Sequence, residues 1–309
     1  MTPRIASCIC GTPAIPGGRA LPRETRLGWL LCAPAVAAML LVTAYPIAYA
    51  VWLSLFRYDL RFPEQRAFVG LANYWSVLTS EVWWQAFANT LIVTVGSVAV
   101  ELVLGFAFAL LMHRAIFGRR SLRTALLVPY GIVTVVAALA WRLAFDPTTG
   151  FVDRLLDLHG DWLAARGPAF FVIIFAEVWK TTPFMALLLL AGFTLVPREL
   201  LSAARVDGAT PVQTFFRITL PLMRPAVVVA LLFRTLDAFR IFDTVFVLTG
   251  GAQDTASVSI VAYRTLITRL NLGLGSAVAV IVFVCVVAIA AIFVKLFGVA
   301  YGGAGARAR

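Results

Sequence analysis

The amino-acid sequence predicts an all-α protein that crosses a membrane six times. Of its 309 residues, 61% are hydrophobic and only 13% are charged, and the mean hydropathy is +0.91. Soluble domains contain about 25% charged residues, so a water-soluble fold of this size could not bury so much apolar surface. Intrinsic disorder requires the opposite composition. The composition therefore indicates a polytopic membrane protein and excludes soluble enzymes and disulfide scaffolds.

Six apolar stretches are each long enough to cross a bilayer as a helix, because a hydrocarbon core of about 30 Å requires about 20 residues. Each stretch is too long and too continuously apolar for a strand of a membrane barrel. Together they predict one transmembrane domain over residues 29–297, between a flexible cytoplasmic leader (1–28) and a cytoplasmic tail (298–309). The predicted spans are residues 29–56, 86–112, 124–145, 169–196, 226–248 and 272–297, with a cytoplasmic loop at residues 197–225.

The basic residues predict the orientation. The leader, the loops after spans two and four, and the C-terminal end carry about twice as many Lys and Arg residues as the opposite loops. The richer side is expected to be cytoplasmic, with both termini inside the cell. The net charge of +11 is then mainly a topology signal, and it also suits anionic lipid headgroups. No nucleic-acid-binding module accompanies this charge, so no nucleic-acid partner is predicted.

No motif for catalysis or metal binding occurs in the sequence. The four cysteines form no CxxC pair, and the two histidines are far apart. The phosphate-binding loop GxxxxGK[ST] is also absent. We therefore predict no catalytic residues, no metal site and no cofactor bound by this chain.

The loop at residues 197–225 is patterned. An apolar stripe from Leu200 to Val206 predicts one short helix, which Asp207-Gly208 ends because glycine allows left-handed backbone angles. The run Thr210-Pro211-Val212-Gln213 is typical of a capping box with Thr210 at the N-cap. A second apolar set follows until Pro221 and Pro225 stop it. Two short helices with a sharp turn would form a firm knob, although periodicity alone equally allows a connector resting on the headgroups.

This loop resembles the "EAA" loop of ABC-importer permeases. The spacing of the motif fits throughout, and the loop lies before the penultimate span, as it does in that family. The residues that carry the resemblance are Ala203-Ala204, Asp207-Gly208-Ala209, Phe216, Ile218, Leu220-Pro221 and Pro225.

The resemblance extends over nearly the whole chain after residue 27. Ala33-Pro34, Gly70–Tyr74 and Leu248–Gly251 are similar to the carbohydrate-uptake subfamily. Three further stretches, residues 128–136, 176–184 and 230–243, are similar in particular to the trehalose-importer permeases of actinobacteria. One position departs from the family, because Ser202 stands where the glutamate of the EAA motif is expected. Either Glu199, one helical turn earlier, replaces that glutamate, or the partner permease supplies the acidic contact.

The resemblance implies the type I ABC-importer permease fold in the cell membrane. It implies pairing with a second six-span permease, two ATPase subunits that bind ATP and Mg, and an extracytoplasmic sugar-binding lipoprotein. The implied substrate is a disaccharide, with trehalose first and maltose, another oligosaccharide or glycerol phosphate as alternatives. In the loop the alanines would permit close approach to the ATPase, Gly208 would make the bend and Asp207 could cap the next helix. The candidate coupling residues are Ser202, Ala203, Ala204, Asp207, Gly208 and Ala209, with Leu220 and Pro221 fixing the exit.

Charged residues inside the spans form the second candidate site. Each costs about 2.5–3.5 kcal/mol near the bilayer centre, so it must face protein or a water-filled cavity. In one interpretation Glu177 pairs with Lys180 and Arg234 with Asp237, which stabilises the bundle. In the other, the side chains line a sugar path, on which Arg240 and Asp243 lie nearer the outer mouth. The candidate path residues are Trp141, Glu177, Lys180, Arg234, Asp237, Phe239, Arg240 and Asp243, with Trp141 or Phe239 stacking on the sugar.

Four alternatives stay open at this point. Glu101, in span two, is expected to be a packed and satisfied carboxylate rather than a proton carrier. The sugar site could also lie mostly on the other permease. An ion-coupled secondary transporter would use intramembrane charges too, but no inverted repeat is found and the EAA-like loop would have no purpose. A purely structural scaffold would leave all these charges with structural explanations only.

Overall fold

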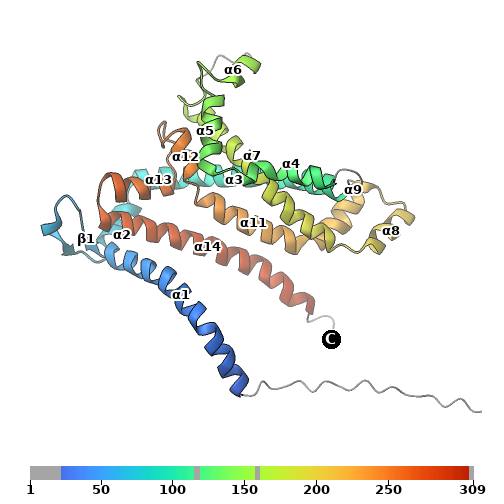
Figure 1. The fold of residues 1–309 in the computed structure, drawn as a ribbon, viewed down its shortest axis with the longest axis horizontal. Helices are drawn as coiled ribbons and strands as arrows, with labels where there is room; N and C mark the ends of the chain where they lie inside the picture. The colour runs from blue at the N-terminus through green and yellow to red at the C-terminus, as the bar shows by residue number, and fades with distance from the viewer. Residues whose placement is uncertain (1–21, 115–118, 157–160, 306–309) are drawn as a thin grey trace, which may run out of the picture. The chain divides into compact units, whose positions relative to one another are not determined.

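The computed structural model describes residues 22–114, 119–156 and 161–305 (Figure 1). The chain divides into two compact units, residues 1–49 and 50–309. Helix α1 (Pro22–Ser54) begins in the first unit. Residues 1–21 of the predicted leader lie outside the described residues, and its remaining residues, 22–28, belong to helix α1. The last residues of the predicted tail, 306–309, also lie outside the described part.

In the part of the second unit that the structure describes, the regular elements are helical except for one small antiparallel hairpin, in which Phe56 pairs with Phe68. Three of its segments are short 3₁₀ or π turns rather than α-helices. Its elements after α1 are β1 (Phe56–Arg57), η1 (Pro63–Gln65), β2 (Ala67–Phe68), α2 (Ala72–Leu78), α3 (Glu81–Arg114), α4 (Arg119–Gly131), α5 (Thr134–Ala144), α6 (Phe151–Leu156), α7 (Arg166–Thr194), α8 (Arg198–Val206), α9 (Pro211–Thr214), η2 (Phe215–Thr219), α10 (Leu220–Leu222), α11 (Arg224–Phe239), α12 (Asp243–Leu248), α13 (Val258–Tyr263), η3 (Arg264–Thr268) and α14 (Leu272–Gly305).

Four helices of the described chain are long and apolar enough to cross a membrane, and two bent helix pairs raise this number to six. The order agrees with the six predicted spans, but two of them are not the continuous helices that we expected. Span three is broken between α4 and α5, which meet at 94° after Pro129 and Gly131. Span five is interrupted between α11 and α12, at residues 240–242.

Helices α3 and α7 make the most extensive contact of the unit, and α11 packs on both. Small residues allow this close approach, as is usual for helices in membranes. A Cβ atom added at Gly105 of α3 would lie 2.7 Å from Cγ of Met185 on α7. A Cβ added at Gly192 of α7 would lie 2.7 Å from Cβ of Ala226 on α11. The three helices therefore form a tight central group.

Polar residues interrupt the hydrophobic core of this central group. One buried cluster contains Ile173 and Ala176 of α7, and a second contains Met185 and Leu189 of the same helix. Glu177 and Thr181 lie between them in the sequence and are also buried. The core of the bundle therefore has a polar layer between two apolar ones.

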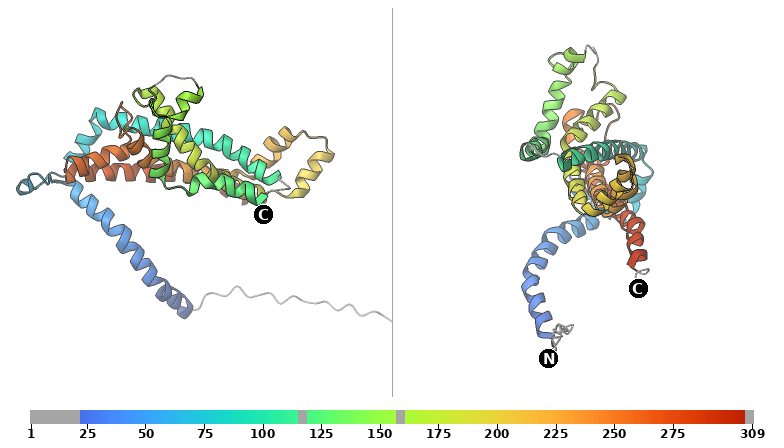
Figure 2. Two further views of the ribbon diagram at one scale, coloured as in Figure 1. Left: turned by 45° about the horizontal axis from the view of Figure 1, so that its top comes forward. Right: turned by 90° about the vertical axis from the view of Figure 1, so that its right-hand side faces the viewer.

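The two ends of the second unit carry different structures. Helices α8 and α9, coloured yellow to orange, protrude at one end of the bundle, whereas the β1–β2 hairpin and α2 lie at the other end (Figures 1 and 2). The long helices α3, α7, α11 and α14 run between these ends (Figure 1). The patterned loop at residues 197–225 is therefore a projection at one end of the helical bundle.

Candidate functional site

The loop at residues 197–225, named the coupling loop below, begins with α8, and this helix ends in a complete Schellman motif. The N–H of Ala209 donates to the carbonyl oxygen of Ala204 at 2.9 Å, and the N–H of Gly208 donates to that of Arg205 at 3.1 Å. Gly208 has a φ of +76°, a left-handed angle that side chains with a Cβ disfavour. The predicted bend at Gly208 is thus confirmed.

A capping box then starts α9 as predicted. The N–H of Gln213 donates to Oγ1 of Thr210 at 3.3 Å, and the N–H of Thr210 donates to Oε1 of Gln213 at 2.9 Å. The expected cap by Asp207 is wrong, because Asp207 is the last residue of the preceding turn. Thr210 holds the capping position instead, three residues farther on.

The predicted stop at Pro221 is also wrong, since the helix passes through this proline. A π turn, η2, precedes it, and the N–H of Leu220 donates to the carbonyl oxygen of Phe215, five residues earlier. Such a turn accommodates one extra residue ahead of a proline, which has no N–H to donate. The chain changes direction only at Met223, where the two helical segments meet at 72°.

The two alanines of the motif face opposite directions. Ala204 is buried, and Leu201 and Phe215 of the same loop pack against the hydrophobic cluster that contains Met112 of α3 and Phe193 of α7. Ala203 is exposed, and Val206 is 89% exposed despite its apolar side chain. The coupling loop is therefore joined to the bundle on one side and presents small and apolar residues on the other.

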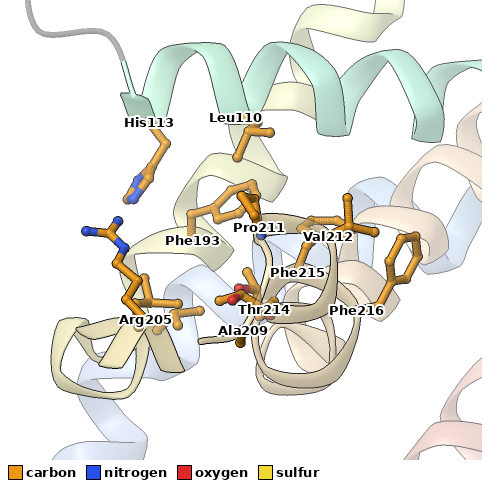
Figure 3. Close-up of a pocket in the computed structure, with 13 residues that line it drawn as sticks. Leu110, His113, Phe193, Arg205, Ala209, Pro211, Val212, Thr214, Phe215 and Phe216 are labelled. Atoms are coloured by element: carbon orange, nitrogen blue, oxygen red, sulfur yellow. The ribbon is translucent and has the colours of Figure 1, made fainter. Parts of the chain in front are cut away.

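A cavity of about 480 Å³ lies between the coupling loop and the ends of α3 and α7. Figure 3 shows Leu110 and His113 of α3 above it, Arg205 of α8 at one side, and Phe215 below. The His113 ring stacks on Phe193 of α7, with ring centroids 5.4 Å apart. The coupling loop thus contacts the bundle at its edges and is not packed against it everywhere.

A second cavity of about 420 Å³, named the polar cavity below, lies where the two broken spans meet. Five of the eight predicted path residues line it, although they come from three helices, α7, α11 and α12, and from the break between α11 and α12. The lining residues are Tyr130, Thr134, Glu177, Lys180, Thr181, Asp237, Arg240, Ile241, Phe242, Asp243 and Thr244.

The break in span five is stabilised by two serines from the segment before and within α13. Oγ of Ser257 donates to the carbonyl oxygen of Ile241 at 3.0 Å, and Oγ of Ser259 donates to that of Arg240 at 3.3 Å. A bilayer offers no water to an unpaired carbonyl, so a broken helix must find such partners or line a cavity. The carbonyl oxygens of the break are therefore hydrogen-bonded to the two serines, and residues of the break also line the polar cavity.

A buried ionic network forms the floor of the polar cavity. Arg234 donates from Nε to Oε2 of Glu101 at 2.6 Å and from Nη2 to Oε1 of the same carboxylate at 2.8 Å. Its Nη1 donates to Oδ2 of Asp237, and its Nη2 lies 3.5 Å from Oε1 of Glu177. Oγ1 of Thr181 also donates to Glu101, at 2.7 Å. Glu101 is thus a packed and satisfied carboxylate, as the sequence predicted, and the Arg234–Asp237 pair is confirmed.

The predicted Glu177–Lys180 pair is wrong. Glu177 instead accepts a hydrogen bond from Oγ1 of Thr244 at 3.0 Å and faces Arg234. Nζ of Lys180 lies 5.8 Å from the centroid of the Tyr130 ring. The reason is that tertiary partners from α11 and α12 reach Glu177 more directly than its helical neighbour does. Lys180, Arg240 and Asp243 thereby line the cavity with no salt bridge to another described residue.

The two aromatic residues predicted to stack on a sugar lie outside this lining. Phe239 is buried in the core and packs against Phe87. Trp141 packs in an aromatic group with Phe175 and Trp179. Sequence reasoning missed Tyr130, which lines the cavity beside the break at Pro129 and Gly131. Those two helix-breaking residues inside an apolar stretch were the signal that could have found it.

Ionisable groups in two exposed loops have shifted pKa values. The Arg61 guanidinium donates to Asp59 at 2.9 and 2.5 Å, and it lowers the pKa of this carboxyl to about 2. Hydrogen bonds from Thr148 and Thr149 lower the pKa of Asp146 well below its ordinary value. Neither loop belongs to the polar cavity. Within the described ranges, no group of three His, Cys, Asp or Glu residues could hold a metal ion.

The polar cavity combines three carboxylates, two cations, three threonine hydroxyls and two aromatic rings. Carboxylates accept hydrogen bonds from hydroxyl groups, Lys and Arg donate them, and aromatic rings offer flat apolar faces. The arrangement suits a polar ligand without a strong net charge better than a lipid or an inorganic ion. The coupling loop, in contrast, suits a docking surface for another protein.

A protein-family comparison assigns the chain to a class. Residues 101–299 match the family of the binding-protein-dependent transport system inner membrane component. The chain belongs to this family of ABC-importer permeases, so the interpretation as an ion-coupled secondary transporter is wrong.

Individual relatives agree with this assignment over most of the chain. The trehalose transport system permease protein SugA of Mycobacterium tuberculosis is 54% identical over 280 residues, which cover 91% of each chain. The trehalose/maltose transport system permease protein MalF of Thermococcus litoralis is 38% identical over 283 residues, 89% of this chain and 94% of the relative. A solved bacterial transporter that imports the acidic polysaccharide alginate has a chain of the same fold, with a TM-score of 0.75, 22% identity and coverage of 89% and 96%.

The chain is therefore a multi-pass inner-membrane permease of a binding-protein-dependent ABC importer. It is a transport subunit and not itself catalytic, because ATP binding and hydrolysis belong to separate ATPase subunits in this family. It works in a complex with those ATPases and with a binding protein.

Proposed function

We propose that this permease imports trehalose and that the polar cavity is the part of its path that contacts the sugar. The observation that carries the proposal is the convergence of Glu177, Lys180, Asp237, Arg240 and Asp243 on one cavity. The relatives named for trehalose transport, at 54% and 38% identity, support the choice of sugar.

The chemistry of the cavity supports a neutral sugar over an anion. Its cations are balanced by carboxylates, which would repel a phosphate group brought close to them. The broken spans add backbone groups at the same place, as in transporters whose discontinuous helices hold the substrate. A disaccharide such as trehalose, with many hydroxyl groups and no charge, matches both features. Glycerol phosphate fits the cavity least well among the alternatives.

In the proposed assembly this chain pairs with a second six-span permease, and two ATPases dock on the coupling loops. An extracytoplasmic sugar-binding lipoprotein delivers the sugar at the opposite end, near the β1–β2 hairpin and α2. The excess of basic residues in and near the coupling loop supports a cytoplasmic position for it. The exposed Ala203, Val206 and Gly208 form the surface that we assign to ATPase contact.

Reconstitution of the whole transporter tests this proposal. The chain is co-expressed with its partner permease, ATPases and binding protein, and the complex is placed in proteoliposomes. We expect uptake of labelled trehalose that requires ATP and the binding protein, is inhibited by unlabelled trehalose and is not inhibited by glycerol phosphate. Uptake of maltose, another oligosaccharide or glycerol phosphate without uptake of trehalose would overturn the choice of sugar.

A single substitution tests the cavity. Replacing Asp243 by Ala removes one lining carboxylate, and we expect lower trehalose uptake by a complex that assembles normally. Glu64→Ala, at an exposed carboxylate of η1 far from the cavity in the sequence, is the matched control. If Asp243→Ala prevents assembly, this carboxylate is structural and not part of the path.

A further inference from the structure

The solvent exposure of the side chains in the ionic network increases from the core of the bundle to the polar cavity. The side chain of Glu101 is 0% exposed, that of Arg234 is 1%, that of Glu177 is 9%, and that of Asp237 is 71%. On the side of the guanidinium that faces the core, Nε and Nη2 of Arg234 donate hydrogen bonds to Glu101. Its outer side faces the two carboxylates that line the cavity.

We propose that Glu101 and Arg234 are positioning residues, which hold the carboxylates of Glu177 and Asp237 in place for the transported sugar. This inference rests on the proposed function, in which the polar cavity contacts the sugar. Glu101 fixes the guanidinium from below, and the guanidinium fixes the two carboxylates above it. Neither Glu101 nor Arg234 lines the cavity.

The planar guanidinium is suited to this role. Its N–H groups diverge in a fixed fork, so one side chain binds Glu101 through two parallel hydrogen bonds and still reaches two other acceptors. A lysine ammonium has the same charge but no such fork. The network thus depends on the shape of Arg234 as well as on its charge.

Asp237 gains most from being held. Its side chain is largely exposed to the cavity, and only Oδ2 is bound, by Nη1 of Arg234. No hydrogen bond from a described residue reaches its other oxygen, Oδ1, which leaves an oriented acceptor for a sugar hydroxyl. A pre-organised acceptor binds a ligand better than a free one, because less side-chain entropy is lost on binding.

The competing role is structural, since the network also connects α3, α7 and α11. The two roles differ in what a neutral replacement does. A buried pair replaced by apolar residues of similar volume is often tolerated, and here Glu177 keeps its hydrogen bond from Thr244 while Asp237 is largely exposed. If the pair only holds the helices together, such a replacement should preserve both assembly and transport. If it positions the carboxylates, assembly should survive and transport should suffer.

The decisive variant combines Glu101→Leu with Arg234→Met in the complete reconstituted transporter. We expect the complex to assemble and its ATPase to respond to the sugar-loaded binding protein. The number of trehalose molecules transported per ATP hydrolysed should fall about tenfold, the loss that one hydrogen bond to a charged group produces. Arg269→Met, the same change at an exposed arginine, is the control and should leave the ratio unchanged.

Arg234→Lys supplies a second test, in which the buried positive charge is kept rather than replaced by an apolar side chain. It keeps the charge opposite Glu101, so the complex should assemble, but it cannot hold Glu177 and Asp237 together. We expect its ratio of sugar to ATP to lie between those of the wild type and the double variant. A wild-type ratio in either variant would overturn the inference and leave the pair a purely structural one.

Asp237→Asn separates failure of this inference from failure of the proposed function. If Asp237→Asn lowers the ratio and the double variant does not, the cavity contacts sugar but is not positioned by Arg234. If none of the three variants changes the ratio, the cavity is not the sugar site and both ideas are wrong. A lowered ratio in all three supports both.

Discussion

The coupling loop and the buried ionic network are held in shape by different means. The loop is built from local backbone hydrogen bonds, since its Schellman motif and capping box join residues that are no more than five positions apart. The network joins residues that are distant in the sequence, with Glu101 and Arg234 separated by 133 positions. The loop has an exposed outer face, whereas the centre of the network is closed to solvent.

Because of this difference, we expect substitutions in the loop and in the network to affect function and stability in a different order. A change in the loop disturbs one short segment and leaves the bundle intact, so coupling should suffer before assembly does. A change at the centre of the network leaves a charge without its partner inside the bundle, so assembly should suffer first. Four substitutions, from the largest expected effect to the smallest, test this contrast.

Glu101→Ala should have the largest effect on stability. It removes the bidentate partner of Arg234 and leaves a buried cation with weaker contacts to Glu177 and Asp237. Breaking a buried ion pair in this way costs about 3–5 kcal/mol. We expect a large loss of complex on size-exclusion chromatography and a lower thermal unfolding temperature. Glu81→Ala, at an exposed position of the same helix, is the control, and an equal effect of the two would argue against a special role for the network.

Gly208→Val should instead uncouple an intact complex. A Cβ there would contact no other atom within 4 Å, so the effect comes from the left-handed backbone angle, which costs about 1–2 kcal/mol for a residue with a Cβ. We expect normal assembly, continued ATP hydrolysis and strongly reduced sugar uptake.

Gly167→Val is the matched control for this prediction. A Cβ at Gly167 would also meet open space, but the backbone angle of this glycine is ordinary. Its replacement should leave uptake near the wild-type level. Wild-type uptake by Gly208→Val would contradict our assignment of the bend to coupling.

The same contrast between local and long-range contacts explains why the sequence predicts the loop better than the network. The loop was predictable almost residue by residue, because Gly208 and the run Thr210–Gln213 specify their own hydrogen bonds. Its two errors, at Asp207 and Pro221, arose where a competing local structure took over. In each case the alternative lay within one turn of the predicted position.

The network was predictable in its composition and in the Arg234–Asp237 pair of one helix, but not in its contacts between helices. The sequence identified charged residues within the spans but paired Glu177 with its helical neighbour, because spacing along one helix was the only geometry available. Its actual partners come from α11 and α12. The break at residues 240–242 was missed for the same reason, since it contains neither Gly nor Pro and depends on Ser257 and Ser259.

Thr210→Ala should have a moderate effect that remains within the loop. It removes the side-chain acceptor of the capping box, and loss of such a cap costs about 1 kcal/mol. We expect an intact complex, a modest decrease in uptake and faster hydrogen exchange of the amides in α9. Thr79→Ala, whose hydroxyl donates to the carbonyl oxygen of Trp75 in an exposed turn, is the control. Unchanged exchange in α9 would mean that Pro211 and the π turn alone fix the second helix.

Asp59→Asn should have the smallest effect, and its pH dependence has a definite sign. The folded pKa of Asp59, about 2, is below the ordinary value of 3.8, so the stabilisation by Arg61 is present above pH 3.8 and is lost as the pH falls through about 2. Because the pair is exposed, solvent screens it and the effect is small. We expect the small difference in unfolding temperature between wild type and variant to be nearly complete between about pH 7 and pH 4 and to shrink as the pH falls toward about 2. A carboxyl with the same pKa in the folded and unfolded states gives no such pH dependence, so a difference that does not change between about pH 4 and pH 2 would mean that Arg61 does not lower the pKa of Asp59. The exposed pair would then resemble neither the coupling loop nor the buried network, since no neighbouring group would fix it.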